Sequence, residues 1–277
     1  MKQVRLPSGE TVAALGQGTW KMAEDPRLRA EETATLRFGI EMGATLIDTA
    51  EMYADGGAEQ LVGEAIEGVR EKVFLVSKVY PHNATRRGTE AACERSLKRL
   101  RVEQLDLYLL HWPGSVPIAE TVEAFEALQQ AGKIRHYGVS NFDRDELEDL
   151  WSVKDGRQIA TDQVLYNLTR RGIELSLIPW LREHNVPLMA YSPLEQGRLV
   201  QDKRLREFAR RTGRTTAQAA LAWLLAKPDV LVIPKSANRE RLKENLGALE
   251  KPLTQEEVEE VEKLFPRPKE AGALEML

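Results

Sequence analysis

Four side chains that can move or steer a proton lie in the first half of the chain. In chain order they are Asp48, Tyr53, Lys78 and His111. The carboxylate, the ammonium and the imidazole each end an apolar run typical of a buried strand, and the phenol follows shortly after the first run. Considered alone, each has an ordinary role as a helix cap, a packed ring, a solvated amine or a core histidine. Their shared position after consecutive strands favours an active site, because a parallel α/β barrel builds its site there.

Together the four groups have the chemistry of a proton donor for a carbonyl. A phenol has a pKa of about 10, which makes it a weak acid at neutral pH. An ammonium about 4 Å away favours the phenolate by roughly 4 kcal/mol at an effective dielectric of about 20, which corresponds to about three pKa units. Asp48 would hold the Lys78 ammonium and cancel part of that effect, so we expect a smaller net lowering of the Tyr53 pKa. His111 would hydrogen-bond the carbonyl oxygen, and the reaction would need a source of hydride.

Strand and helix patterns alternate along the chain. Two short runs, 3–6 and 11–15, flank Pro7-Ser8-Gly9 and predict a hairpin. Strands are then predicted at 45–48, 73–78, 105–110, 134–140, 160–164, 187–191 and 230–233, and helices at 58–69, 89–100, 118–131, 144–151 and 255–264. About eight strand–helix units, with no Gly/Ser/Pro-rich linker between them, predict a single closed parallel barrel domain over 1–277.

Composition narrows the possible partners. The chain has 277 residues, of which 42% are hydrophobic, and a net charge of −4 with both signs mixed. This predicts no binding to nucleic acid or anionic membrane, and no apolar run reaches the roughly 20 residues that span a bilayer. The first residues lack the apolar core of a signal peptide, and Cys93 is the single cysteine, so we expect a cytoplasmic protein without disulfides. Cys93 lies in an alanine-rich helix and is expected to be buried rather than reactive.

Later strands offer polar groups for a bound cofactor. No Gly-x-Gly-x-x-Gly follows the first strand, which argues against a Rossmann site. Ser140, Asn141 and Gln163 come at the ends of the fifth and sixth strands and can hydrogen-bond an amide, while Tyr191 offers a flat ring for stacking. After the eighth strand come Lys235, Ser236, Arg241, Glu244 and Asn245. The first three of these suit an extra phosphate, because barrels commonly bind phosphate beside their last two strands.

As a set, these motifs resemble the aldo-keto reductase family over essentially the whole chain. The matching segments are 16–20, 46–53, 76–78, 109–112, 138–141, Gln163, 191–194 and 233–236, with Arg241 and Asn245. The resemblance implies a (β/α)8 TIM barrel, with an N-terminal β-hairpin that closes its bottom. It implies that Tyr53 is the general acid, that Lys78 and Asp48 tune it, and that His111 orients the carbonyl. Within the family, the likeness is greatest to small bacterial members that reduce methylglyoxal and related aldehydes.

The same resemblance implies a site for NADPH. Tyr191 would stack on the nicotinamide, and the cations after the eighth strand would favour NADPH over NADH. The full set implied for the cofactor is Gly18, Thr19, Trp20, Asp48, Ser140, Asn141, Gln163, Tyr191, Ser192, Leu194, Gln196, Gly197, Lys235, Ser236, Arg241, Glu244 and Asn245. The carbonyl substrate would contact Trp20, Tyr53, Tyr80, His111 and Trp112.

Two features depart from the family pattern. Glu195 stands where many members have a small residue, and its carboxylate would either weaken the hold on the cofactor or face solvent. The loop 113–117 is short and lacks aromatic residues, and the segment beyond Pro266 is brief, so we expect an open site for small or varied carbonyls. Trp20, Tyr80 and Trp112 would form its apolar walls, with ordinary packing as the alternative for each.

Two other functions are compatible with a barrel. In an aldolase, Lys78 would form a Schiff base, which requires a neutral amine, and the nearby Asp48 argues against it. A cofactor-binding regulatory subunit with little turnover would have a degraded catalytic set, whereas all four positions are filled here. The four histidines show no ligand spacing and one cysteine cannot build a thiolate cluster, so we expect no metal. We expect a monomer that acts on a small carbonyl compound.

Overall fold

Eight parallel strands form one sheet in which each strand pairs with the next along the chain. The structure is a computed structural model that describes residues 2–277. The strands are β3 (Gln17–Gly18), β4 (Leu46–Asp48), β5 (Phe74–Val79), β6 (Leu105–Leu110), β7 (Ile134–Ser140), β8 (Asp162–Leu165), β9 (Leu188–Tyr191) and β10 (Val230–Val232). Every residue of β4, β5, β6, β8 and β10 is buried, as expected for a parallel sheet that is covered on both faces.

The sheet closes into a barrel where its first strand meets its last. Isolated parallel bridges link the chain around β3 to β10 and to the residues just after it. The Gly16 N–H donates to the Val232 carbonyl over 2.8 Å. A Cβ on Gly16 would lie 2.6 Å from the Leu46 carbonyl oxygen, and a Cβ on Gly18 would lie 2.9 Å from that of Ile233. The two glycines therefore permit the close backbone approach that closure requires.

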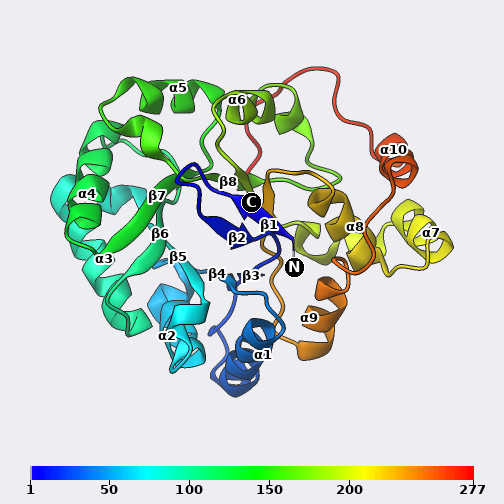
Figure 1. Cartoon of the computed structure of the whole chain (residues 1–277), viewed down its shortest axis with the longest axis horizontal. Helices are drawn as coiled ribbons and strands as arrows, with labels where there is room; N and C mark the ends of the chain where they lie inside the picture. The colour runs from blue at the N-terminus through cyan, green and yellow to red at the C-terminus, as the bar shows by residue number, and fades with distance from the viewer. Residues whose placement is uncertain (1) are drawn as a thin grey trace.

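Helices surround the barrel (Figure 1). They are α1 (Arg29–Glu41), α2 (Gly57–Ile66), α3 (Arg86–Leu100), α4 (Ile118–Gln130), α5 (Arg144–Ser152), α6 (Leu177–Glu183), α7 (Lys203–Arg211), α8 (Thr216–Leu225), α9 (Arg239–Leu246) and α10 (Gln255–Leu264). Local sequence fixes several of their starts. Asp143 with Glu146 forms a capping box for α5, and Thr254 with Glu257 does the same for α10.

A hairpin of β1 (Gln3–Arg5) and β2 (Thr11–Ala13) lies across one mouth of the barrel (Figure 1). Its Glu10 carboxylate pairs with Arg135 over 2.6 Å and with His136 over 2.7 Å, close to the N-terminal end of β7. The hairpin therefore covers the mouth at which the strands begin. The opposite mouth, where the strands end, is left for a site.

The predicted barrel with its N-terminal hairpin is confirmed. β6, β7 and α10 have the predicted bounds, whereas β5 continues to Val79, so that Lys78 lies inside the strand rather than at its end. Cys93 is buried in α3, and burial raises the pKa of its thiol to about 12, as expected of a packing residue. Among residues 2–277, no helix combines the length and the apolar character needed to cross a membrane.

Candidate active site

One cavity of about 1430 Å³ opens at the mouth where the strands end. Asp48, Ser140 and Tyr191, the last residues of β4, β7 and β9, all line it. Of the residues predicted for the site, all except Thr19, Lys78 and Tyr80 border this cavity. The structure therefore brings residues from distant parts of the chain to one mouth of the barrel.

Three of the four predicted catalytic groups share hydrogen bonds at the base of this cavity. The Lys78 ammonium donates to Asp48 Oδ1 over 2.8 Å, to the Thr49 carbonyl over 2.8 Å and to the Tyr53 hydroxyl oxygen over 3.2 Å. Lys78 is fully buried, and its three donors are all engaged. Because the Tyr53 oxygen accepts from Lys78, the phenol's own proton is left for a group in the cavity.

Tyr53 starts a short turn, η2 (Tyr53–Gly56), that has an uncommon backbone. Ala54 and Asp55 have φ values of 50° and 51°, and Gly56 follows at 86°. Left-handed conformations cost a non-glycine residue about 1–2 kcal/mol, so the surroundings must fix this turn. Arg99 packs against Gly56, where a Cβ would lie 2.5 Å from its Nε, and it is held by a buried glutamate of α2. Helices α2 and α3 thus position the phenol.

Burial determines how this cluster is protonated. It raises the pKa of Tyr53 well above its usual value, and the charge of Asp48 adds to the shift. The expected net lowering by Lys78 is therefore wrong for this structure, because desolvation of the phenolate outweighs the attraction of the ammonium. Burial also lowers the pKa of Lys78, while Asp48 opposes that shift. At neutral pH Tyr53 is a phenol that keeps its proton.

His111 lies edge-on to Tyr53, with 5.8 Å between the ring centroids and 72° between the ring planes. Burial, with a smaller contribution from the Lys78 charge, lowers the pKa of His111 to about 2. The ring is therefore neutral at physiological pH. Its Nδ1 is buried and has no hydrogen-bond partner among residues 2–277. This favours the tautomer with the proton on Nε2, since an N–H at Nδ1 would have no acceptor.

The predicted amide-binding residues of β7 and β8 are hydrogen-bonded to one another. Ser140 Oγ donates to the Gln163 carbonyl over 2.8 Å, and Asn141 Nδ2 donates to Ser140 Oγ over 3.1 Å. The Tyr191 hydroxyl donates to Asn141 Oδ1 over 2.9 Å. Gln163 Nε2 donates to Asp48 Oδ2 over 2.8 Å. Gln163 therefore links this group to the carboxylate that holds the Lys78 ammonium, a contact that the sequence did not reveal.

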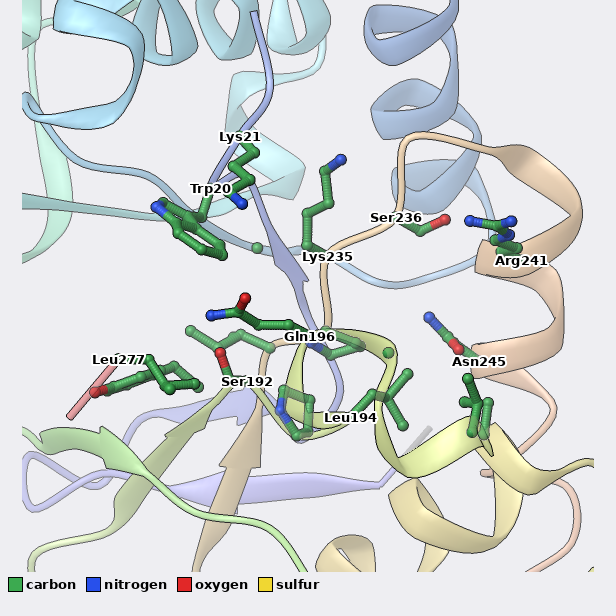
Figure 2. A pocket seen from close by; sticks show the side chains of 18 of the residues that line it. Trp20, Lys21, Ser192, Leu194, Gln196, Lys235, Ser236, Arg241, Asn245 and Leu277 are labelled. Atoms are coloured by element: carbon green, nitrogen blue, oxygen red, sulfur yellow. The ribbon is translucent and has the colours of Figure 1, made fainter. Parts of the chain in front are cut away.

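The other end of the cavity is lined by cations. Lys235 and Ser236 lie in the loop after β10, and Arg241 and Asn245 lie on α9 (Figure 2). Within the described residues 2–277, no ion pair joins Lys235 or Arg241 to a carboxylate. Unpaired cations that border a cavity suit a ligand with several negative charges.

Three predicted contacts differ in the structure. Thr19 is fully buried, and its hydroxyl donates to the last carbonyl of β4 over 2.9 Å instead of facing the cavity. Tyr80 packs at 90° against Trp112, with 5.8 Å between the ring centroids, so it supports a cavity wall without forming one. Glu195 does not face solvent, because the residue is buried and its carboxylate accepts hydrogen bonds from Arg170, while its effect on the hold on a cofactor stays a prediction.

The cavity also includes residues that sequence reasoning missed. Lys21 borders it beside Trp20, with its ammonium 4.4 Å from the centre of that ring, and its adjacency to Trp20 was a usable signal. Arg206 of α7 and the pair Met276 and Leu277 border it as well, and no local pattern connects these residues with strand ends. The segment beyond Pro266 therefore contributes to the cavity wall, while the expected openness of the site to varied carbonyls stays a prediction.

Known proteins are similar to this chain over its whole length. The model of the aldo/keto reductase family matches residues 14–265. The methylglyoxal reductase YeaE of Escherichia coli (strain K12) is 49% identical, over 100% of this chain and 99% of its own length. The glyoxal reductase of Bacillus subtilis (strain 168) is 35% identical, over 94% of this chain and 92% of its own. The crystal structure of an aldo/keto reductase from Klebsiella pneumoniae, in complex with NADP and acetate, has a TM-score of 0.97 and 48% identity, over 100% of this chain and 99% of that one.

Proposed function

This chain belongs to the aldo/keto reductase family, and from that premise we propose that it reduces small aldehydes and 2-oxoaldehydes to alcohols with NADPH, with Tyr53 as the proton donor. Membership of the family makes the protein an oxidoreductase. The observation that carries the proposal is the 3.2 Å contact of Lys78 Nζ with the Tyr53 oxygen, beside the neutral ring of His111. The similar methylglyoxal and glyoxal reductases support the substrate class.

Tyr53 donates its proton to the carbonyl oxygen as that oxygen gains negative charge. Burial keeps the phenol protonated until then. An alkoxide is a far stronger base than an ordinary phenolate, so the proton moves readily once charge develops. The Lys78 ammonium, already in contact with the phenol oxygen, stabilises the phenolate that remains, through a hydrogen bond that becomes charge-assisted.

His111 and Asp48 prepare the site for this transfer. The neutral His111 ring donates from Nε2 to the carbonyl oxygen and thereby holds that oxygen near the Tyr53 hydroxyl. Its low pKa keeps it from acting as a competing acid at neutral pH. Asp48 accepts from the buried Lys78 over 2.8 Å, which favours the charged form of the amine despite its burial.

The residues around the cavity fit NADPH, which when bound supplies the hydride. Tyr191 offers its ring for stacking on the nicotinamide, and Asn141 and Gln163 offer amide groups for the carboxamide. Lys235 and Arg241 bind the additional 2′-phosphate as a point charge and a fork, respectively. NADH lacks that phosphate, so we propose a preference for NADPH. The NADP held by the similar structure from Klebsiella pneumoniae supports this assignment.

An aldolase reaction through Lys78 fits this geometry less well. All three donors of the amine are engaged, and Lys78 does not border the cavity. A carbonyl compound in the cavity would have to displace Tyr53 to reach Nζ. A regulatory subunit without turnover is also disfavoured, because the four catalytic groups are intact and in contact.

Initial rates with methylglyoxal and a panel of other small aldehydes test the proposal. We expect oxidation of NADPH that depends on the aldehyde, with a kcat/KM for NADH at least about tenfold lower, since a lost charged hydrogen bond contributes about 1.5–3 kcal/mol. The absence of NADPH oxidation with every aldehyde would contradict it. Borohydride treatment in the presence of substrate gives a second reading, because trapping of the substrate on Lys78 would favour the aldolase instead.

A further inference from the structure

Glu195 belongs to a turn that forms one wall of the cavity. This cofactor-side turn (residues 192–197) follows Tyr191, and its members other than Glu195 border the cavity (Figure 2). Ser192, Glu195 and Gln196 have φ values of 47°, 50° and 53°. Non-glycine residues adopt such values only where surrounding contacts hold them. Something outside the turn must therefore fix its shape.

Arg170 and Asn167, in the loop after β8, supply those contacts. Arg170 Nη2 and Nε donate to Glu195 Oε1 over 2.7 and 3.0 Å. Asn167 Nδ2 donates to Glu195 Oε2 over 2.7 Å and to the Ser192 carbonyl over 3.0 Å. Burial alone would raise the pKa of Glu195, but these hydrogen bonds outweigh it and hold the pKa below its usual value. The turn is thus anchored by a largely buried, charge-assisted pair.

The same Arg170 reaches a second carboxylate. Its Nη1 donates to Glu275, in the segment that follows α10. Glu275 directly precedes Met276 and Leu277, which border the cavity. We call residues 274–277 the cover segment. Burial raises the pKa of Tyr191, the ring proposed to stack on the nicotinamide, to about 12, and the backbone of Leu277 in this segment offsets part of that rise.

The two carboxylates that pair with Arg170 differ in exposure to solvent. The side chain of Glu195 is 6% exposed, whereas that of Glu275 is 47% exposed. Exposed ion pairs are weak and screened by salt, while a buried pair resists separation. We therefore expect the ion pair with Glu275 to separate more readily than the ion pair with Glu195. In Figure 2, Leu277 lies near Ser192 and on the opposite side of the view from Arg241, away from the proposed phosphate site.

We propose that Arg170 is a positioning residue that couples the cofactor-side turn to the cover segment and thereby sets which carbonyl compounds the site accepts. This inference rests on the proposed function. A cofactor that orders the turn also fixes Arg170, which strengthens its hold on Glu275, and the coupling is reciprocal. While Glu275 is paired with Arg170, the apolar side chains of Met276 and Leu277 contact a small aldehyde in the cavity. A released segment makes room for a bulky one.

The variant Glu275→Gln tests the exposed ion pair between Arg170 and Glu275. Glu270→Gln is the matched control, because Glu270 is an exposed residue that follows α10 outside the cover segment and forms no ion pair within residues 2–277. For Glu275→Gln we expect the kcat/KM of a bulky aromatic aldehyde, relative to that of methylglyoxal, to rise about two- to fivefold, with the dissociation constant for NADPH unchanged. Added salt should shift this ratio in the same direction in the wild type and not in the variant. A ratio equal to that of Glu270→Gln would overturn the proposal.

The variant Arg170→Gln removes the ion pairs with Glu195 and with Glu275 at once. We expect the same change in the aldehyde ratio and, in addition, a dissociation constant for NADPH raised about threefold or more, because the cofactor-side turn loses its anchor. An unchanged dissociation constant would overturn the coupling between the two parts. Should this variant fail to fold, the surface variant Glu275→Gln still decides the question.

Hydrogen exchange of the cover segment provides a readout that is independent of turnover. Binding of NADPH should slow exchange at residues 274–277 in the wild type but not in Glu275→Gln. Equal slowing in the two proteins would overturn the coupling. A wild type that oxidises no NADPH with any aldehyde would refute the proposed function itself. A normal wild-type rate with an unaltered ratio in Glu275→Gln would remove only the role of Arg170.

Discussion

The two ends of the cavity use charge in opposite ways. At the proposed catalytic end, the Lys78 ammonium is fully buried and pairs with Asp48 over 2.8 Å. At the proposed phosphate end, Lys235 and Arg241 border the cavity and form no ion pair with a carboxylate in the described part of the chain, although the charges of Glu32 and Glu24 attract Lys235. Residues of the chain pair the charges at the first end, whereas we propose that the phosphate of a ligand pairs those at the second. Charge at one end therefore fixes geometry before any ligand arrives, and charge at the other end provides affinity.

Breaking the internal pair should have the largest effect. Lys78→Met leaves Asp48 buried without its partner, which costs about 3–5 kcal/mol of the free energy of unfolding. It also removes the group that stabilises the Tyr53 phenolate, so kcat should fall by about 10²–10⁴. Chemical denaturation and steady-state rates measure the two effects. The double variant Asp48→Asn/Lys78→Met is the control, and it should recover much of the stability but none of the turnover.

Removing a cation from the open end should weaken binding alone. Arg241→Ala should raise the dissociation constant for NADPH by about 10–100-fold, because a hydrogen bond to a charged group contributes about 1.5–3 kcal/mol. The constant for NADH and the kcat at saturating NADPH should stay close to those of the wild type. Fluorescence titration measures the binding, with Arg239→Ala, an exposed arginine of α9 that does not border the cavity, as the control. Equal weakening of the two cofactors would exclude the 2′-phosphate role.

Acid titration tests whether the catalytic end keeps His111 neutral. Its pKa of about 2 in the folded protein lies below the ordinary value of 6.5, so the unfolded chain takes up this proton first as the pH falls. His111 should therefore lower the free energy of unfolding by about 2 kcal/mol between about pH 6.5 and 4.5. Over that range His111→Gln should lose stability more gradually than the wild type. Parallel curves for the two proteins would mean that the folded protein protonates the ring.

Asp162 is a second buried carboxyl group, and unlike Asp48 it has no charged partner in the described part of the chain. Its effect on the free energy of unfolding should be smaller. Asp162 in β8 is fully buried, and within residues 2–277 neither of its oxygens has a partner at hydrogen-bond geometry. Burial raises its pKa well above the usual value, and the nearby Phe142 N–H offsets only part of the shift. The folded state thus keeps a proton that the unfolded chain releases above about pH 4, and stability falls as the pH rises.

Asp162→Asn should therefore stabilise the protein by about 1 kcal/mol or more at about pH 8, and by less at about pH 4. Denaturation curves at the two pH values measure the difference. If the gain in the free energy of unfolding from Asp162→Asn does not grow with pH, Asp162 is ionised in the folded protein.

Much of the barrel could be predicted because strands buried on both faces are continuous apolar runs, as β6 and β10 are. The polar groups that follow such runs predicted which residues gather at one end of the cavity, since parallel strands place their ends at one mouth. The family resemblance supplied the remaining roles. The barrel fold and the parallel direction of its strands were enough to predict that Asp48, Lys78 and His111 lie close together.

The predictions that went wrong depended on contacts between residues far apart in the chain. The alternative in which Glu195 faces solvent was wrong, and the sequence did not reveal this because its partner Arg170 lies 25 residues away in sequence. Arg170 is in turn 105 residues from Glu275, so no local pattern showed that a later segment covers the cavity. The pKa of Tyr53 was misjudged for a related reason. The sequence indicated a neighbouring charge but not the extent of burial, and burial dominates the shift.

The central claim is that Tyr53 supplies the proton. Tyr53→Phe keeps the ring and removes the hydroxyl, and Tyr80→Phe is the matched control, since Tyr80 does not border the cavity. The measurement is the single-turnover rate of NADPH oxidation by methylglyoxal. We expect it to fall by about 10²–10⁴ in Tyr53→Phe, with the binding of NADPH nearly unchanged, and to stay close to wild type in Tyr80→Phe. A rate in Tyr53→Phe close to that of the wild type would contradict the account.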